Sequence, residues 1–453
     1  MASLVAFMKS FPSLYFTNFF LVGGTGLLTT YLALYLGQHD VSTFWIGLLT
    51  SCYYLGLLLG SKLGYHLIKS VGHIRAFSAS TAIVTACVAS HGVSDNIYFW
   101  LLLRFVVGLG MMCNYMVLES WLNEQAAPEQ RGRVFSFYML TSYLGMVGGQ
   151  FALSQFPELG YAPLFLICIA LSFGIVPITI TRRIHPKPLK PIQVSLVGFF
   201  KTIPQSLTAV CFAGVINGSF YGLAPTFASQ AGLSAEEIAM YMAVTIFAGL
   251  LAQWPMGVIS DKVRRSILLR TNAIMIGLVS LGLFFLPTQA PFSYWLTFAF
   301  GLFAFTLYPL SSALANSRVD DEHRVGVSSA LLVAFGAGAC VGSASLAQVM
   351  TYFGPHSLYA TFAVLTVIMY AALTYINARQ KEEEPEPTDY VAATSDITSS
   401  PLAATLDPRI EDKTAQEQML IVDGHIINTD IFSDDLDEEL AQHAQSKESE
   451  PSK

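Results

Sequence analysis

Two ionisable side chains in one apolar stretch of the chain, residues 101–133, are the first candidates for chemistry. Arg104 is the one Lys or Arg placed deep inside a hydrophobic segment, and an arginine at a bilayer centre costs about 2.5 to 3.5 kcal/mol on insertion scales. Its guanidinium is therefore expected to face protein or a water-filled cavity. There it would hold an anionic group, pair with a carboxylate, or bond structurally to backbone carbonyls of neighbouring helices.

Glu119 is the most deeply embedded acidic residue of the same stretch. On an ideal helix it lies about 22 Å along the axis from Arg104 and about 60° around it, so the two side chains cannot pair within the helix. A carboxylate in a low-dielectric medium keeps its proton more readily, so Glu119 could carry a proton through a transport cycle. The alternative is a gate contact with Lys62, Arg131 or Arg133, and the sequence leaves both roles open.

Composition indicates what positions these residues. The chain is 53% hydrophobic and 12% charged, with a mean hydropathy of +0.52, outside the range of ordinary soluble domains. We count about twelve apolar runs long enough to cross a bilayer as helices. The predicted class is therefore an all-α integral membrane protein. The runs are 14–36, 44–66, 76–94, 97–119, 134–156, 162–181, 205–229, 236–258, 268–287, 293–315, 325–350 and 356–378.

Basic residues predict the orientation, because Lys and Arg near span ends stay on the cytoplasmic side. They fall in alternate connections, which places both termini in the cytoplasm and fits a bacterial inner membrane. The first run lacks a small-residue cleavage site and is expected to stay as a helix. The basic positions are Lys69, Arg75, Arg131, Arg133, 182–201, 262–270, Arg318, Arg324, Arg379 and Lys381.

An internal repeat predicts the architecture. Shifting the chain by 193 residues superimposes the first six runs on the second six, which indicates two parallel six-helix copies. The expected domains are residues 1–181, a basic cytoplasmic linker at 182–204, residues 205–378, and a cytoplasmic tail at 379–453. Matching pairs include Gly56 with Gly249, Gly108 with Gly301, Tyr115 with Tyr308, Asn123 with Asn316, Arg131 with Arg324, Gly145 with Gly338 and Gly149 with Gly342.

The tail differs in composition from the rest of the chain. It holds 19 Asp and Glu against 6 Lys and Arg, a net charge of −13 that leaves +6 of the total of −7 for the remainder. Such a segment is expected to be solvated and disordered. Within residues 418–427 two apolar stretches flank Asp423 and Gly424, which is a hairpin signal. The tail either docks on a cytoplasmic partner or is dispensable.

Short motifs extend the argument to a family. Residues 257–265, GVISDKVRR, resemble the G-x-x-x-D-R-x-G-R-R loop of the major facilitator superfamily without its second glycine. The equivalent loop at 64–75 has Ile68 where the family has aspartate. With the two six-helix copies, the resemblance covers residues 14–378. It implies the twelve-helix fold and favours a charge network in the second half.

Two further stretches of the same region carry the resemblance. Residues 104–110, RFVVGLG, look like the superfamily's R-x-x-x-G-x-G, which is linked to proton coupling. Residues 145–150, GMVGGQ, resemble a degraded G-P-x-x-G-G antiporter motif. The block ESWLNE at 119–124 looks like the YcaD-like subgroup of the superfamily. The resemblance therefore implies a transporter and weakens an antiport mechanism.

Candidate site residues are polar or aromatic positions at helical spacing in matching spans, where glycine and proline breaks point at a central site. For each one, packing between helices is the alternative role. Tyr53 and Tyr54 are interpreted as interface or packing aromatics. The substrate-binding candidates are Arg104, Asn114, Tyr115, Asn18, Thr25, Asn217, Tyr221 and Tyr308, with Gln150 and Gln253 as additions. The coupling or gating candidates are Glu119, Arg131, Asp261, Lys262 and Arg324.

The expected function is secondary active transport of a small polar or amphipathic solute by alternating access, coupled to protons. The solute is anionic if Arg104 faces it. Multidrug-type efflux, passive facilitation, and a transporter-like sensor or assembly protein remain alternatives. No phosphate-binding loop, metal-ligand spacing or nucleophile motif occurs, so no enzyme activity, cofactor, metal or nucleic-acid partner is expected. The expected partners are a small-molecule substrate and membrane lipids, with protons as the coupling candidate and a protein bound by the tail as one alternative to a dispensable tail.

Overall fold

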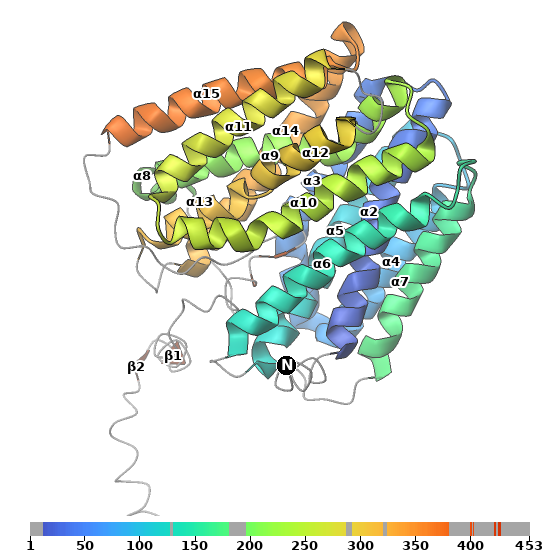
Figure 1. Ribbon diagram of the computed structural model, residues 1–453. Helices are drawn as coiled ribbons and strands as arrows, with labels where there is room; N and C mark the ends of the chain where they lie inside the picture. The colour runs from blue at the N-terminus through green and yellow to red at the C-terminus, as the bar shows by residue number, and fades with distance from the viewer. Residues whose placement is uncertain are drawn as a thin grey trace, which may run out of the picture. The chain divides into compact units, whose positions relative to one another are not determined.

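The computed structural model describes residues 12–126, 130–180, 196–286, 292–319, 324–379, 399–400, 402, 421–422 and 425–426. The chain divides into two compact units, Met1–Arg409 and Ile410–Lys453. The helices belong to the first unit (Figure 1). The second unit contains two short strands and is treated separately below.

The first unit consists of two successive sets of long helices with α8 (Leu196–Thr202) between them. The first set is α2 (Pro12–Gln38), α3 (Thr43–Val71), α4 (His73–Ser90), α5 (Ile97–Gln125), α6 (Arg131–Leu153) and α7 (Ala162–Ile180). The second set is α9 (Pro204–Gln230), α10 (Ala235–Ser260), α11 (Arg265–Phe285), α12 (Phe292–Ala304), α13 (Leu307–Asn316), α14 (Arg324–Phe353) and α15 (Ser357–Arg379).

These helices confirm the predicted all-α membrane class. In the described part of the chain, ten helical segments are long and apolar enough to cross a membrane, with α12 and α13 taken together as one segment. The helices α4 and α6 occupy the two remaining predicted spans but contain more polar residues, among them Arg131 and Arg133 at the start of α6. Length and hydropathy therefore identify most spans, and position in the repeat identifies the other two.

The ends of several predicted spans differ from the observed helices; α3 and α5, for example, extend to Val71 and Gln125, past the predicted ends at 66 and 119. The run 293–315 is interrupted at Phe305 and Thr306, where α12 ends and α13 begins. The run 76–94 ends four residues early, because the chain turns after Ser90. An apolar run predicts that a segment lies in the membrane, but it does not predict a local break in its hydrogen-bond ladder.

The packing within the two halves is duplicated, as the 193-residue repeat predicts. Four packed pairs in the first half have equivalents in the second: α2 with α6 and α9 with α14, α3 with α5 and α10 with α12, α2 with α7 and α9 with α15, α4 with α7 and α11 with α15. Each equivalent helix is the partner that the offset assigns. The repeat seen in the sequence is therefore a repeat of contacts.

Glycines make the closest of these duplicated contacts possible. A Cβ built on Gly145 would lie 2.5 Å from the carbonyl oxygen of Phe19 in α2, and one built on Gly338 would lie 2.3 Å from that of Cys211 in α9. Because the obstructing atoms are backbone, no side-chain rearrangement would make room. Small residues at membrane helix interfaces let backbones approach in this way.

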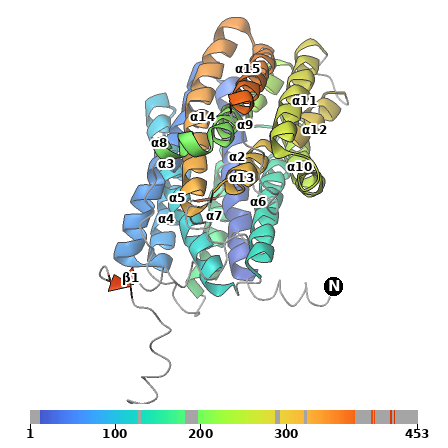
Figure 2. The ribbon, with the colours of Figure 1, turned by 90° about the vertical axis from the view of Figure 1, so that its left-hand side faces the viewer.

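The two halves meet along α3 with α14 and along α6 with α10 (Figure 1, Figure 2). We call the end of the bundle where α3 begins the Gly47 end, and the opposite end, where α5 ends, the Glu119 end. At the Gly47 end a Cβ on Gly47 would lie 2.2 Å from the Cβ of Ala347 in α14. Gln230 at the end of α9 also donates a hydrogen bond of 3.1 Å to the Thr43 hydroxyl. The halves are therefore in direct contact at the Gly47 end.

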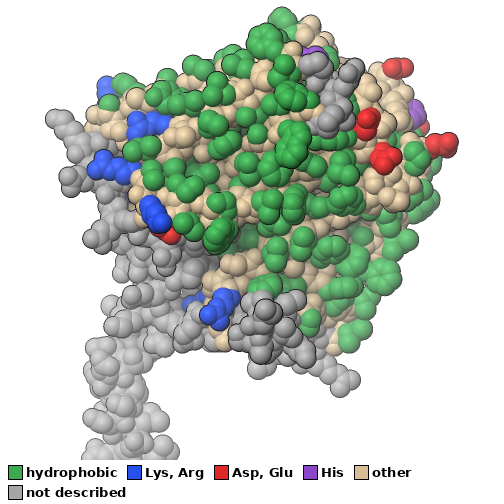
Figure 3. Space-filling model, viewed as in Figure 1, with side chains coloured by type: hydrophobic (Ala, Val, Ile, Leu, Met, Phe, Trp, Pro, Cys, Tyr) green, Lys and Arg blue, Asp and Glu red, His purple; other side chains and the backbone are tan. Residues whose placement is uncertain are grey.

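The surface of the first unit has the charge distribution of a membrane protein. Figure 3 shows hydrophobic side chains across the face in view, with the Lys and Arg side chains mainly at one end and most of the Asp and Glu side chains at the other. On α10, Glu236 lies in the first turn and Lys262 follows the last, while Trp254 between them is 80% exposed. Exposed large apolar residues between charged ends are expected where lipid covers the protein.

The tail gives one confirmed detail. In the unit Ile410–Lys453, β1 (Ile421–Val422) pairs antiparallel with β2 (His425–Ile426), in the register Ile421 with Ile426 and Val422 with His425. This register places Asp423 and Gly424 between the strands, as the hairpin signal predicts. Helix α8 lies in the predicted linker, while residues 181–195 lie outside the described residues. The predicted boundaries of halves, linker and tail stay predictions.

Candidate functional site

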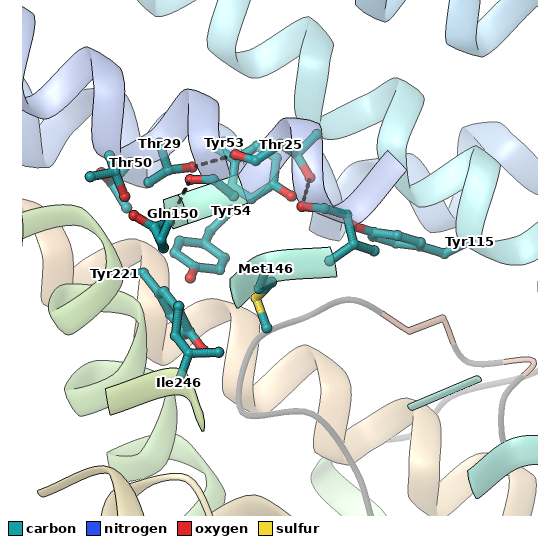
Figure 4. Close-up of a pocket in the computed structure, with 13 residues that line it drawn as sticks. Thr25, Thr29, Thr50, Tyr53, Tyr54, Tyr115, Met146, Gln150, Tyr221 and Ile246 are labelled. Carbon is teal, nitrogen blue, oxygen red and sulfur yellow. Dashed lines mark hydrogen bonds between the residues drawn. The ribbon is translucent and has the colours of Figure 1, made fainter. Parts of the chain in front are cut away.

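A small cavity lies between the two halves near the middle of the bundle (Figure 4). Its volume is about 20 Å³, against the roughly 10 to 15 Å³ that one water molecule needs. The first half supplies the lining from α2, α3, α5 and α6, and the second half supplies it from α9 and α10. The lining residues are Val22, Thr25, Gly26, Thr29, Thr30, Thr50, Tyr53, Tyr54, Tyr115, Met146, Gln150, Tyr221 and Ile246.

The threonines on α2 lie on one face of that helix because they are spaced four residues apart. The hydroxyl of Thr25 donates to the Leu21 carbonyl at 3.0 Å, and that of Thr29 donates to the Thr25 carbonyl at 3.1 Å. Each hydroxyl thus satisfies its donor within the helix. The Thr25 oxygen keeps its lone pairs as acceptors on this wall of the cavity, whereas the Thr29 oxygen also accepts from Arg104.

Gln150 lines the same space and carries an unsatisfied acceptor. Its amide nitrogen donates to the carbonyl of Gly26 at 3.4 Å, while Oε1 is buried and has no hydrogen-bond partner within the described residues. Figure 4 shows Gln150, Tyr54 and Tyr221 converging from different helices. A buried acceptor without a partner is costly unless a donor occupies the cavity. This feature points to a ligand that carries hydroxyl or N–H groups.

Arg104 lies beside the cavity and is engaged by two of its lining residues. Nη2 donates to the Thr29 hydroxyl at 3.1 Å, and the guanidinium carbon lies 4.6 Å from the centre of the Tyr53 ring. The side chain is only 2% exposed and is not among the lining residues. Arg104 therefore lies outside the cavity and fixes the positions of Thr29 and Tyr53, which line it. Tyr53, which we expected to be an interface or packing aromatic, also contacts the arginine through its ring.

Three predicted substrate residues hold helices together away from this cavity. Asn18 on α2 donates to the Tyr138 carbonyl at 3.1 Å and to hydroxyls on α6. Asn114 accepts from Thr81 at 3.2 Å, which joins α5 to α4, and Asn217 donates to the Ala304 carbonyl at 3.3 Å, which joins α9 to α12. In this conformation these asparagines therefore join neighbouring helices, which was the alternative role that we considered for them.

The predicted residues therefore separate into groups by place. Thr25, Tyr115 and Tyr221 line the cavity together with Gln150. Tyr308 on α13 lies elsewhere, with its ring 5.6 Å from that of Phe335 in an edge contact. Among the polar and aromatic lining residues, the sequence analysis did not consider Thr30 and Thr50, and it interpreted Tyr53 and Tyr54 as interface or packing aromatics. The spacing of Thr50 one helical turn before Tyr53 and Tyr54 on α3 was the signal for these three residues.

Glu119 lies at the end of the bundle opposite Gly47 and is completely buried. Its carboxylate accepts a backbone N–H bond from Ser400, 2.9 Å from each oxygen, and the Ser400 hydroxyl also donates to Oε2. The side chain of Tyr138 on α6 interacts with it as well. The predicted partners of Glu119 were basic loop residues, whereas the contacts shown here come from a tyrosine and from the tail.

The other coupling candidates lie at helix ends. Asp261 follows the last residue of α10, and it and Lys262 are exposed. Arg131 is the first residue of α6 and is partly buried, while the side chain of Arg324, the first residue of α14, lies outside the described residues. The cavity lining contains none of these residues, so a coupling role for them stays a prediction.

A second hollow lies between α11 and α15. It has a volume of about 480 Å³ and is lined almost entirely by apolar side chains such as Ile274, Leu278 and Val367. These three residues belong to the exposed apolar surface, at 47%, 58% and 69% exposure. Because this surface has the character of a lipid contact, the hollow is a groove in the membrane-facing side of the protein.

Comparisons with known proteins agree with this geometry. The model of the Major Facilitator Superfamily matches residues 14–343. The MFS-type transporter YcaD of Escherichia coli strain UMN026 is 30% identical over 367 residues, which cover 81% of this chain and 94% of that protein. The YcaD transporter of Shigella flexneri is also 30% identical over the same shares of both chains.

Solved structures show the same fold at low sequence identity. The nucleoside transporter NupG aligns with a TM-score of 0.69 at 13% identity, over 82% of this chain and 99% of that chain. A bacterial homologue of the human lysosomal transporter Spinster, in an inward-facing and occupied conformation, aligns with a TM-score of 0.63 at 16% identity, over 90% and 98%. Fold, repeat and sequence agree, and this chain is therefore a multi-pass membrane protein that belongs to the major facilitator superfamily of transporters.

Proposed function

We propose that the protein is a secondary transporter that moves a small uncharged solute rich in hydroxyl or N–H groups. The observation that carries this proposal is the unpartnered acceptor of Gln150 in a cavity lined by both halves. The lining offers threonine hydroxyls, tyrosines and one amide, and it contains no charged side chain. A solute with donors and a flat or apolar face would match these groups.

This substrate class replaces the anionic solute that we considered for Arg104. The guanidinium donates to Thr29 and lies over Tyr53, so an anion in the cavity would have to draw it away from both. A neutral solute would bind in the cavity while Arg104 keeps its contacts with Thr29 and Tyr53.

We propose alternating access as the mechanism, with the Glu119 end facing the cytoplasm as the basic residues predict. The halves are in contact at the Gly47 end, and the transporter would be closed there to the outside. Rocking of the two halves about the central cavity would then open the Gly47 end.

Proton coupling is part of the proposal. Among the described residues Glu119 is the buried carboxylate, so it is the group whose protonation could change during the cycle. A passive facilitator is the second candidate, because the cavity lining itself holds no acidic residue. A protonophore that abolishes uphill uptake into vesicles would favour coupling, and unchanged equilibration would favour the facilitator.

The substrate class is tested by thermal stabilisation of the purified protein. Uncharged polyols, sugars and nucleosides are compared with carboxylates and phosphates at pH 5.5 and pH 8. A ligand that binds the folded state at about 100 times its Kd stabilises it by about 2.7 kcal/mol, so we expect the melting temperature to rise with an uncharged compound.

Two variants test whether the rise in melting temperature depends on the cavity. Thr29→Val and Gln150→Leu should each remove most of the rise that the uncharged compound causes. Thr361→Val is the matched control, because Thr361 makes the same bond to the carbonyl four residues earlier and lies on α15, away from the cavity. Stabilisation by anions alone, or an undiminished shift in both cavity variants, would contradict the proposed substrate class.

A further inference from the structure

The buried carboxylate of Glu119 binds a segment that lies 281 residues later in the chain. The Ser400 amide is 2.9 Å from each carboxylate oxygen, and its hydroxyl adds a third hydrogen bond to Oε2. An ionised carboxylate can only accept hydrogen bonds, and Ser400 alone donates three of those that the Glu119 carboxylate accepts. Both residues are completely buried.

The segment has its own local order and its own apolar contact. The Leu402 amide donates to the Ser400 hydroxyl at 3.2 Å, so this hydroxyl accepts from the chain and donates to Glu119. The side chain of Leu402 is 8% exposed and belongs to the main hydrophobic core. Ser399 is also buried. A polar anchor followed by an apolar one is the pattern of a peptide held in a site.

The site involves both halves of the bundle. Glu119 lies on α5, and Tyr138 on α6 interacts with it from the same half. Tyr308 on α13, in the other half, interacts electrostatically with Glu119.

We propose that Glu119 and its surroundings form a peptide-binding site occupied by the chain's own residues Ser399, Ser400 and Leu402, and that this segment restrains transport while it is bound. The inference rests on the proposed function in one respect, because alternating access requires the Glu119 end to close. A segment bound at a buried carboxylate between the halves prevents that closure. Its release is then a step in activation.

A carboxylate introduced at position 400 should disrupt the contact with Glu119, because the two negative charges repel each other. In the full-length Ser400→Asp variant two carboxylates would face each other without water between them, so the segment leaves the site. Ser400→Ala keeps the backbone N–H bonds and loses the hydroxyl, which makes its effect intermediate. Ser433→Asp adds the same charge in the unit Ile410–Lys453 and serves as the matched control.

The test has two readouts on full-length protein. In vesicles Ser400→Asp should transport the stabilising solute about 5-fold faster or more, the lower range of coupling between two sites, while Ser433→Asp matches wild type. In detergent, a synthetic peptide of residues 394–407 should raise the melting temperature of Ser400→Asp, and the same peptide carrying Ser400→Asp should not.

The two readouts separate this inference from the proposed function. Peptide stabilisation without flux of any solute supports the site and overturns the transport proposal. Faster flux in Ser400→Asp with peptide stabilisation supports both. Unchanged flux, or no effect of the wild-type peptide on Ser400→Asp, overturns the restraint. If Ser400→Asp does not fold, Ser400→Ala with the same two measurements decides in its place.

Discussion

The two halves of the transporter share their packing and differ in their charge. Gly145 and Gly338 make the same close approach to a backbone carbonyl in equivalent helices. Applying the offset of 193 to the charged residues gives Thr297 for Arg104 and Ser312 for Glu119, both uncharged. The small residues of the framework thus occur in both copies, whereas the charged residues Arg104 and Glu119 belong to the first copy alone.

This difference separates two physical demands. Membrane helices are held together by close packing, which must be satisfied in every copy of the helix pair. A buried charge costs free energy and needs partners, so a single copy is kept where its partners exist. At the equivalent position in the second half, the uncharged Thr297 is buried, and its hydroxyl forms a hydrogen bond with that of Thr245.

The largest effect is expected where the halves are alike. Gly145→Val and Gly338→Val should each destabilise the protein by about 3 kcal/mol or more, because a Cβ would fall within 2.5 Å of a backbone oxygen in both cases. Size-exclusion profiles and melting temperatures measure the loss of folded protein. Gly37→Ala is the control, as a Cβ there meets nothing within 4 Å. A mild effect in one copy only would show that the framework is not equivalent.

A smaller effect is expected from exchanging residues between the two loop motifs. Ile68→Asp should cost about 2 to 3 kcal/mol, since Ile68 is 2% exposed and a carboxylate there loses its hydration near the end of a helix. Asp261→Ile should change stability by less than about 0.5 kcal/mol because Asp261 is exposed. Denaturation curves of both variants, with Ile68→Val as control, measure the contrast. Equal costs would mean that burial does not distinguish the loops.

The smallest effect concerns the charge beside the cavity. Arg104→Lys should lower solute transport about tenfold, since an ammonium group cannot both cover the Tyr53 ring and reach Thr29 as the planar guanidinium does. Thr297→Val, the equivalent position in the second half, should leave transport within about twofold of wild type. Initial uptake rates at fixed solute concentration measure both. A matching loss in Thr297→Val would remove the functional asymmetry between the halves.

Asn18 and Thr25 show where sequence reasoning reached its limit at the site. Both lie on one stripe of α2, so both were equal candidates for the cavity. The close approach of α6 at Gly145 brings Asn18 against Tyr138 and Ser142, whereas Thr25 lies where the halves leave a small space. Helical spacing predicts which residues share a face, but the neighbour of that face depends on how two helices cross.

Arg104 shows the same limit for charge. Its cost in a bilayer predicted that it faces protein or a water-filled cavity, and in the structure it contacts Thr29 and Tyr53, which were not among the expected partners. The sequence left open whether the guanidinium points into the cavity. That choice was made by Tyr53 on α3, which no spacing within α5 could reveal.

The sequence by itself determined the membrane class, most of the span positions, the duplicated helix pairs and the hairpin at Asp423 and Gly424. These features follow from local hydropathy, from the internal repeat and from the residue types of the turn, all of which can be read from the order of residues in the chain. Only the tertiary structure decided which polar residues line the cavity, that Arg104 lies behind it, and that Ser400 binds Glu119. Each depends on side chains far apart in sequence, and their proximity is set by packing that no single segment encodes.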